Sequence, residues 1–154
     1  MEIEERLNEL GIVLPEVTAP LAAYLPYSIS ENFVYVSGQL PFWEGKPMYT
    51  GKIGSDLKLA EGQAAARCCG LNLMAQVKNA CDGNLDKLSA VIKLTGYVNS
   101  TGDFTEHPKV INGASDLMVE IFGERGKHSR VAVGCNSLPL GCSVEIAGIF
   151  KISS

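Results

Sequence analysis

An arginine and a glutamate occur in two segments near the C-terminus that we expect to form neighbouring strands, 129–136 and 143–152. Side chains alternate between the two faces of a strand, so Arg130 shares its face with Ala132 and Gly134. If the two strands form a hairpin with its turn centred at 137–138, Glu145 lies opposite Arg130. The sequence therefore predicts an Arg–Glu pair on the face of the sheet away from the helices.

The small residues beside this pair, Ala132, Gly134 and Ala147, leave room for a ligand. A guanidinium in such a recess binds a carboxylate through two parallel hydrogen bonds, and a neighbouring glutamate orients or deprotonates a water molecule. The alternative is a plain cross-strand ion pair between Arg130 and Glu145, worth about 0.2–1 kcal/mol. The pattern alone leaves both interpretations open.

Other catalytic templates are missing from the sequence. The two histidines, His107 and His128, have no metal-ligand spacing, and neither a nucleophile elbow, a dinucleotide fingerprint nor a P-loop occurs, so we expect no metal and no cofactor. The five cysteines are odd in number and include the adjacent pair Cys68-Cys69, without a C-x-x-C motif. We interpret them as reduced packing residues of a cytoplasmic protein; nothing supports a Cys/His nucleophile pair.

Length and charge further limit the kinds of protein that this sequence can encode. We expect the 154 residues to form a single domain, residues 1–154, in which residues 1–24 are an N-terminal extension with a short helix. The net charge is −4 and no Lys/Arg run is present, which argues against nucleic acid as a partner. No apolar run approaches the roughly 20 residues of a membrane span, and the acidic start Met1–Glu5 does not resemble a signal peptide.

Hydrophobic periodicity predicts the elements that position these residues. An apolar stripe with 3.6-residue spacing predicts helices, and β-branched runs bounded by turn residues predict strands. The order is β-β-β-α-β-α-β-β, an α+β fold with one sheet and two helices on one face. The expected helices are 59–80 and 108–123; the expected strands are 27–29, 33–37, a short strand or loop around Met48 and Ile53, 88–99, 129–136 and 143–152.

Two motifs in this order resemble those of the RidA/YjgF family. Val34-Tyr35-Val36-Ser37-Gly38-Gln39 is similar to its V-x-V-S-G-Q segment, and Arg130, Leu138-Pro139 and Glu145 are similar to its R-x(7)-L-P-x(5)-E signature. The resemblance spans about residues 24–152 and looks like a longer branch of the family. It implies a chorismate-mutase-like fold, a homotrimer whose sheets form a central barrel, and clefts between subunits that need no cofactor.

The family archetype hydrolyses reactive 2-imino and enamine acids to 2-ketoacids and ammonia. By resemblance, Arg130 binds the substrate carboxylate and Glu145 handles water. The same resemblance assigns substrate-binding roles to Asn112, to the backbone of Ser37, Gly38 and Ala132, and to a tyrosine, which is Tyr24 or the nearby Tyr27. Ala132 stands where the archetype has a reactive cysteine, so chemistry that depends on that thiol is absent.

Three functions remain as hypotheses. The first is the deaminase. The second is a trimer that binds or senses a small ketoacid without turning it over, which the loss of the cysteine at Ala132 favours. The third is a ribonuclease or translation inhibitor, an activity associated with parts of the family, which the acidic charge disfavours.

Overall fold

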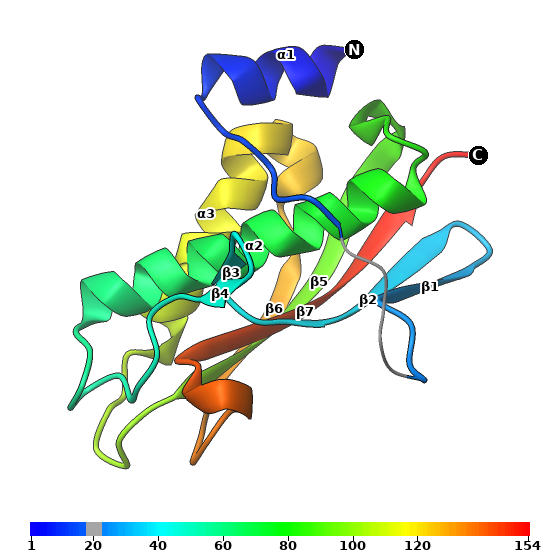
Figure 1. The fold of residues 1–154 in the computed structure, drawn as a ribbon. Helices are drawn as coiled ribbons and strands as arrows, with labels where there is room; N and C mark the ends of the chain where they lie inside the picture. Colours follow the sequence, from blue (N-terminus) through cyan, green and yellow to red (C-terminus); the bar gives the residue numbers. More distant parts are fainter. Residues whose placement is uncertain (18–22) are drawn as a thin grey trace.

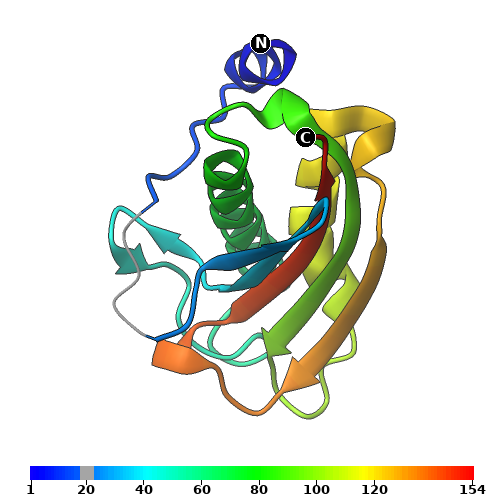
Figure 2. The same cartoon turned by 90° about the vertical axis from the view of Figure 1, so that its right-hand side faces the viewer.

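A five-stranded sheet forms the centre of the computed structural model, which describes residues 1–17 and 23–154. Helices α2 and α3 pack on the same face of this sheet (Figures 1 and 2), which confirms the expected α+β layers. The strand order is β1-β2-β7-β5-β6, so β1 and β6 are the two edges. The bounds are β1 Tyr27–Ser30, β2 Phe33–Gln39, β5 Leu88–Asn99, β6 Ser129–Cys135, β7 Val144–Ile152, α2 Leu59–Ala80 and α3 His107–Phe122.

In place of the third expected strand, the chain forms a small hairpin outside the main sheet. β3 (Phe42–Trp43) and β4 (Lys46–Pro47) pair with each other in their own two-stranded sheet. Met48 and Ile53 lie outside both strands, and Ile53 instead forms isolated bridges to Leu57 and Ser100. Between β2 and α2, the chain therefore adds a hairpin and a loop rather than a strand of the main sheet.

The predicted hairpin between β6 and β7 is wrong. β6 pairs with β5 in parallel, and β7 pairs with the opposite side of β5 antiparallel. The connecting segment crosses the end of β5, where Asn99 N donates to Ser143 O at 2.8 Å and Asn99 Nδ2 donates to Cys142 O at 3.2 Å. These bonds hold the connecting segment across the end of β5. The segment includes the 3₁₀ turn Pro139–Gly141. β6 and β7 are therefore held apart.

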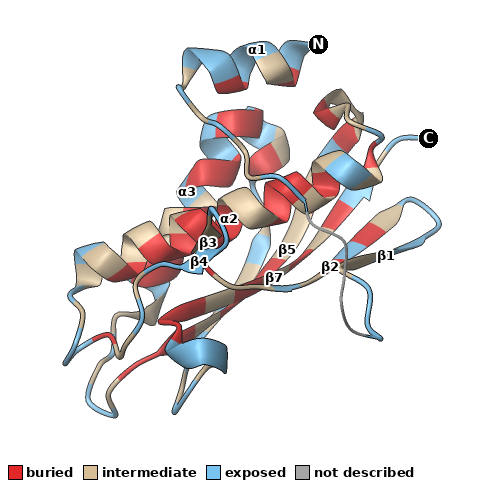
Figure 3. Ribbon diagram, viewed as in Figure 1, coloured by how far each residue is buried: buried red, intermediate tan, exposed pale blue. Residues whose placement is uncertain are grey.

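Helices α2 and α3 approach each other closely over the sheet. A Cβ atom at Gly113 of α3 would lie 2.1 Å from the backbone carbonyl oxygen of Gln63 in α2, so glycine is required there. Apolar residues at helical spacing form one face of α3, and this face is buried (Figure 3). That face consists of Val110, Ala114, Leu117, Met118 and Ile121.

The predicted N-terminal helix is present as α1 (Glu2–Glu9), and its residues Ile3 and Leu7 are buried. The Asp86 carboxylate accepts hydrogen bonds from the backbone of Ile3 at 2.8 Å and of Glu2 at 3.0 Å, and these bonds lower the pKa of Asp86. A carboxylate at a helix start satisfies amide groups that lack a partner within the helix. The N-terminal extension is thus docked through α1, while residues 18–22 of its predicted range lie outside the described residues.

No helix within residues 1–17 and 23–154 combines the length and the apolar character that crossing a membrane requires.

Candidate functional site

Arg130 is held by α3. Its Nη1 atom donates to Asn112 Oδ1 at 2.7 Å and to Ser115 Oγ at 3.2 Å. Asn112 and Ser115 are three residues apart, so they lie on the same side of the helix. The side chain of Arg130 therefore lies on the helix face of the sheet, beside Leu94 of β5. The sequence predicted it on the opposite face, away from the helices, which we call the open face.

One edge of the Arg130 guanidinium remains available. The group has five N–H donors, and the two bonds to α3 use both hydrogens of Nη1. In the part of the chain that the structure describes, neither Nε nor Nη2 of Arg130 has a hydrogen-bond or ion-pair partner. The hydrogens on Nε and Nη2 point side by side, which is the geometry that binds a carboxylate with two parallel bonds.

Small residues follow Arg130 along β6. Ala132 lies beside Gly96 of β5, and Gly134 lies beside His107 at the start of α3. A Cβ atom at Gly134 would lie 2.6 Å from His107 Nε2, so glycine is needed for this approach. The predicted small-residue setting of Arg130 is therefore present, although on the face opposite to the one expected.

Glu145 belongs to a second group of the predicted residues, on the open face of the sheet. Its carboxylate lies over Gly38 of β2, where a Cβ atom would be 2.6 Å from Glu145 Oε2. Burial raises the pKa of the Glu145 carboxyl above its ordinary value. No hydrogen bond or ion pair joins the Glu145 carboxylate to any residue among 1–17 and 23–154, so its oxygens are available to a water molecule or a ligand.

Ser37 and Tyr24 lie near this second group. Ser37 Oγ donates to Leu25 O at 2.6 Å and thereby holds the segment that precedes β1. Tyr24 in that segment is 68% exposed, whereas the Tyr27 hydroxyl accepts a hydrogen bond from Asn79 of α2 at 2.9 Å. Of the two candidate tyrosines, Tyr24 thus has the more exposed side chain.

One chain does not bring the two groups together. We call Arg130, Asn112 and Ala132 the arginine group, and Glu145, Gly38, Ser37 and Tyr24 the glutamate group. The arginine group lies at edge strand β6 on the helix face, and the glutamate group lies on the far side of β5 (Figure 2). The predicted contact between Arg130 and Glu145 is wrong, because β5 separates their strands and the two side chains point to opposite faces.

Comparison with known proteins decides the family. A family model described as "YjgF/chorismate_mutase-like, putative endoribonuclease" matches residues 4–150. The protein belongs to the YjgF family. Its chorismate-mutase-like fold and the RidA/YjgF resemblance of its motifs are therefore confirmed.

Individual proteins also match over nearly the whole chain. Protein TCP17 of Trypanosoma cruzi is 42% identical over 153 residues, which is 99% of this chain and 95% of that protein. The crystal structure of Atu1372 from Agrobacterium tumefaciens, described as having unknown function, is 50% identical with a TM-score of 0.92, covering 98% of this chain and 92% of that one. A "putative endoribonuclease" from Shewanella oneidensis is 41% identical with a TM-score of 0.93, covering 99% and 100%.

Sequence reasoning missed two residues next to Arg130 in this YjgF protein. Ser115 Oγ lies 2.8 Å from His128 Nε2, and His128 Nδ1 lies 2.7 Å from the carbonyl oxygen of Gly126. The spacing of Ser115 from Asn112 was the signal that could have placed Ser115 beside Arg130. Nothing in the sequence indicated His128, because its contact depends on the turn Gly123–Gly126 after α3.

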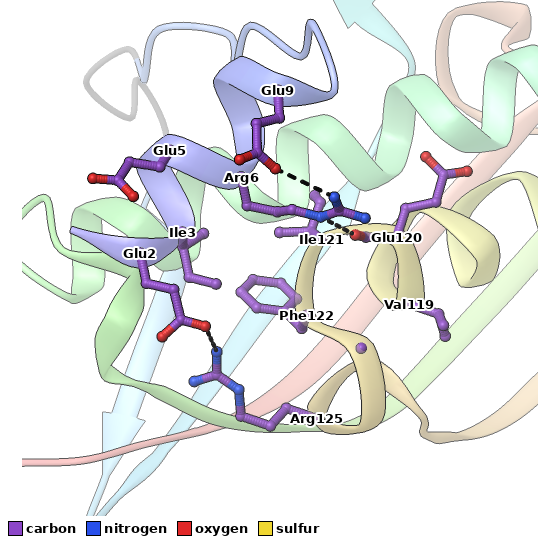
Figure 4. Close-up of a pocket in the computed structure, with 11 residues that line it drawn as sticks. Glu2, Ile3, Glu5, Arg6, Glu9, Val119, Glu120, Ile121, Phe122 and Arg125 are labelled. Atoms are coloured by element: carbon purple, nitrogen blue, oxygen red, sulfur yellow. Dashed lines mark hydrogen bonds and ion pairs between the residues drawn. The ribbon is translucent and has the colours of Figure 1, made fainter.

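A separate hollow of about 370 Å³ lies between α1 and the end of α3 (Figure 4). Arg6 crosses it, donating from Nε to Glu120 O at 3.1 Å and pairing with Glu9 at 3.5 Å, and Glu2 lies 4.0 Å from Arg125. The hollow contains none of the predicted site residues, and both of its arginines, Arg6 and Arg125, already have partners. Within the described ranges, no three His, Cys, Asp or Glu side chains cluster as a metal site would require.

Proposed function

We propose that this protein is a hydrolytic deaminase of 2-imino and enamine acids, and that its site is shared between neighbouring subunits of a homotrimer. The observation that carries the proposal is the guanidinium of Arg130, whose Nη1 is held by Asn112 and Ser115 while its Nε/Nη2 edge is free. A planar fork of this kind suits the carboxylate that every 2-imino and 2-keto acid carries.

The separation of the two groups supports the intersubunit arrangement. Arg130 and Glu145 can serve one substrate if the glutamate group comes from a second copy of the chain. The open face of the sheet carries exposed apolar side chains, which a barrel of sheets from three copies would bury. These side chains are Tyr35, Val131 and Val133, each between 39% and 44% exposed.

The chemistry divides among three parts of the site. Arg130 holds the carboxylate, backbone groups near Ala132 hold the imine nitrogen, and Glu145 takes a proton from the attacking water. The water oxygen bonds to C2 as the C=N π bond opens, and Glu145 passes the proton to the nitrogen. Glu145 then relays the hydroxyl proton to the same nitrogen, so that C2=O forms while the C2–N bond breaks and ammonia and the 2-ketoacid are released. The raised pKa of Glu145 makes its carboxylate a stronger base than an ordinary glutamate. No step needs a thiol or a cofactor, so Ala132 is compatible with turnover.

Turnover is measured as ketoacid formed from an iminoacid that an amino-acid oxidase generates in place, with spontaneous hydrolysis subtracted. Arg130→Lys should weaken pyruvate binding by about 1.5–3 kcal/mol, because a point charge cannot replace the planar fork. Glu145→Gln should lower turnover more than binding, because it keeps the shape but loses the base. Unchanged pyruvate affinity in Arg130→Lys would overturn the role of Arg130.

Mixed trimers test the shared site directly. Arg130→Ala and Glu145→Gln variants, each inactive alone, are unfolded together in equal amounts and refolded. If each site takes Arg130 from one subunit and Glu145 from the next, about a quarter of the sites regain both residues, and activity returns in proportion. No recovery in verified mixed trimers would contradict the shared site, and a monomer mass by light scattering at micromolar concentration would contradict the trimer.

A second candidate function is a trimer that binds a small ketoacid without turning it over. It is favoured by the arginine group, which among the described residues of one chain has binding donors but no carboxylate beside them to act as a base. Measurable pyruvate binding without acceleration of any iminoacid tested would select this function. The endoribonuclease activity named in the family description would instead require salt-sensitive RNA binding, which the net charge of −4 disfavours. The five free cysteines suit the cytoplasmic location that we propose for either function.

A further inference from the structure

A directed chain of hydrogen bonds ends at Arg130. The carbonyl oxygen of Gly126 can only accept, so the His128 Nδ1 atom 2.7 Å away carries a hydrogen. In a neutral imidazole the other nitrogen, Nε2, is then an acceptor, and it takes the hydroxyl hydrogen of Ser115 at 2.8 Å. The Ser115 oxygen thus keeps its lone pairs for Arg130 Nη1, which donates to it at 3.2 Å.

We infer that Ser115 and His128 are positioning residues for the carboxylate site, an inference that rests on the proposed function of Arg130. Asn112 alone would leave the guanidinium free to turn about its bond to that one acceptor. The second bond, to Ser115, fixes the plane of the guanidinium and the direction of its Nε/Nη2 edge. His128 acts one step further back, because it keeps the Ser115 hydroxyl hydrogen turned away from the cation.

The charge pattern around Arg130 fits a ligand-binding role better than a purely structural one. Both acceptors of Nη1, the Asn112 amide and the Ser115 hydroxyl, are neutral, and no carboxylate in the described ranges pairs with the guanidinium. Arg130, Asn112, Ser115 and His128 are all half-buried, so the cation is neither neutralised by the protein nor fully hydrated. An anionic ligand is the missing partner of such a group.

The chain offers a matched control at the other end of β6. Ser100 Oγ lies 3.2 Å from His107 Nε2, in a second serine–histidine pair that does not contact Arg130. Variants of this pair lose a comparable interaction at a comparable place in the fold. Any change in ligand affinity beyond that of the control variants His107→Gln and Ser100→Ala therefore reports on Arg130 rather than on general stability.

Pyruvate affinity by calorimetry tests the inference. Ser115→Ala should weaken binding on the order of 5- to 10-fold, whereas Ser115→Thr, which keeps the hydroxyl, should stay within about 2-fold. His128→Asn keeps an amide near Gly126 but does not reach Ser115, whereas the longer His128→Gln reaches it, so Asn should weaken binding more than Gln. In turnover, KM should rise with little change in kcat, because positioning of the carboxylate affects bound substrate and transition state alike.

A measurement without ligand separates failure of this inference from failure of the proposed function. Nitrogen NMR should show the hydrogen of His128 on Nδ1, and Ser115→Ala should broaden or lose the Arg130 Nε–H signal while His107→Gln leaves it unchanged. An unaltered Arg130 signal in Ser115→Ala, or a pyruvate affinity equal to that of the control variants, overturns the inference. If the wild type binds no 2-ketoacid yet these signals behave as expected, the positioning holds and the choice of ligand is wrong.

Discussion

Gly113→Ala should destabilise the protein although alanine is the better helix former. A Cβ atom at this position would lie 2.1 Å from the carbonyl oxygen and 2.9 Å from the carbonyl carbon of Gln63. Both atoms belong to the backbone of α2 and cannot rotate away, so α3 must move outward by about 1 Å to reach ordinary van der Waals contact. The same movement would pull Asn112 and Ser115, which flank the glycine, away from Arg130.

The magnitude follows from two opposing terms. Overpacking of a well-packed interface costs about 1–3 kcal/mol, and a contact this short against rigid backbone belongs at the upper end. Replacing glycine by alanine inside a helix returns about 1 kcal/mol. The expected net loss is therefore about 2 kcal/mol. Gly70→Ala in α2 is the control, because its Cβ would lie 3.0 Å from the Leu117 side chain, which can shift, and its net effect should be within about 1 kcal/mol of zero.

Urea unfolding followed by circular dichroism, with every variant at the same protomer concentration, measures both changes. The midpoint should fall clearly for Gly113→Ala and stay near that of the wild type for Gly70→Ala. If the two variants are equally stable, the close approach of α2 and α3 at Gly113 is wrong and the reasoning fails with it.

Three further predictions concern the open face and the thiols. Burial raises the pKa of Glu145 in the folded state above its ordinary value of 4.5. Above pH 4.5 the folded state therefore binds more protons than the unfolded state, and the free energy of unfolding falls as pH rises. Glu145→Gln removes this loss, so its gain in melting temperature should be larger at pH 7 than at pH 4. Gly38→Ala should displace the Glu145 carboxylate and lower kcat on the order of 10- to 100-fold while pyruvate affinity holds, and an unchanged kcat would count against Glu145 as the base. Burial raises the pKa of Cys68 to about 11, and burial also raises the pKa of half-buried Cys135, so a thiol reagent at neutral pH should label the native protein slowly, Cys135 first, and all five thiols after unfolding.

Most secondary structure of this protein was predictable from local pattern. The bounds of α2 and β5 agree with the expected ranges, and the apolar face of α3 is buried as its 3.6-residue spacing indicated. These features depend on residues near one another in sequence, where periodicity is informative. The buried positions within α2 were less predictable: Leu71 is half-buried, whereas Leu73, two residues further on, is fully buried in the core.

Strand neighbours were not predictable in the same way. Alternation along β6 and β7 showed correctly which residues share a face within each strand, such as Arg130 with Ala132. It could not show that β5 lies between the two strands, because that depends on how the connection after Cys135 crosses the end of β5. The error therefore concerns long-range pairing, and it also placed Arg130 on the wrong face of the sheet.

The observed separation explains why Arg130 remains available to a ligand. Had Arg130 and Glu145 been cross-strand neighbours, they would have formed an ion pair worth about 0.2–1 kcal/mol, and the guanidinium fork would have been occupied by the protein's own carboxylate. With β5 between their strands, Arg130 has neutral acceptors on one nitrogen, and Glu145 has no cation beside it among the described residues. Each chain thus carries an uncompensated cation and an uncompensated carboxylate on different faces. The proposed trimer explains this arrangement, because two copies, together with a substrate that carries a carboxylate at one end and an electrophilic carbon beside it, would satisfy both.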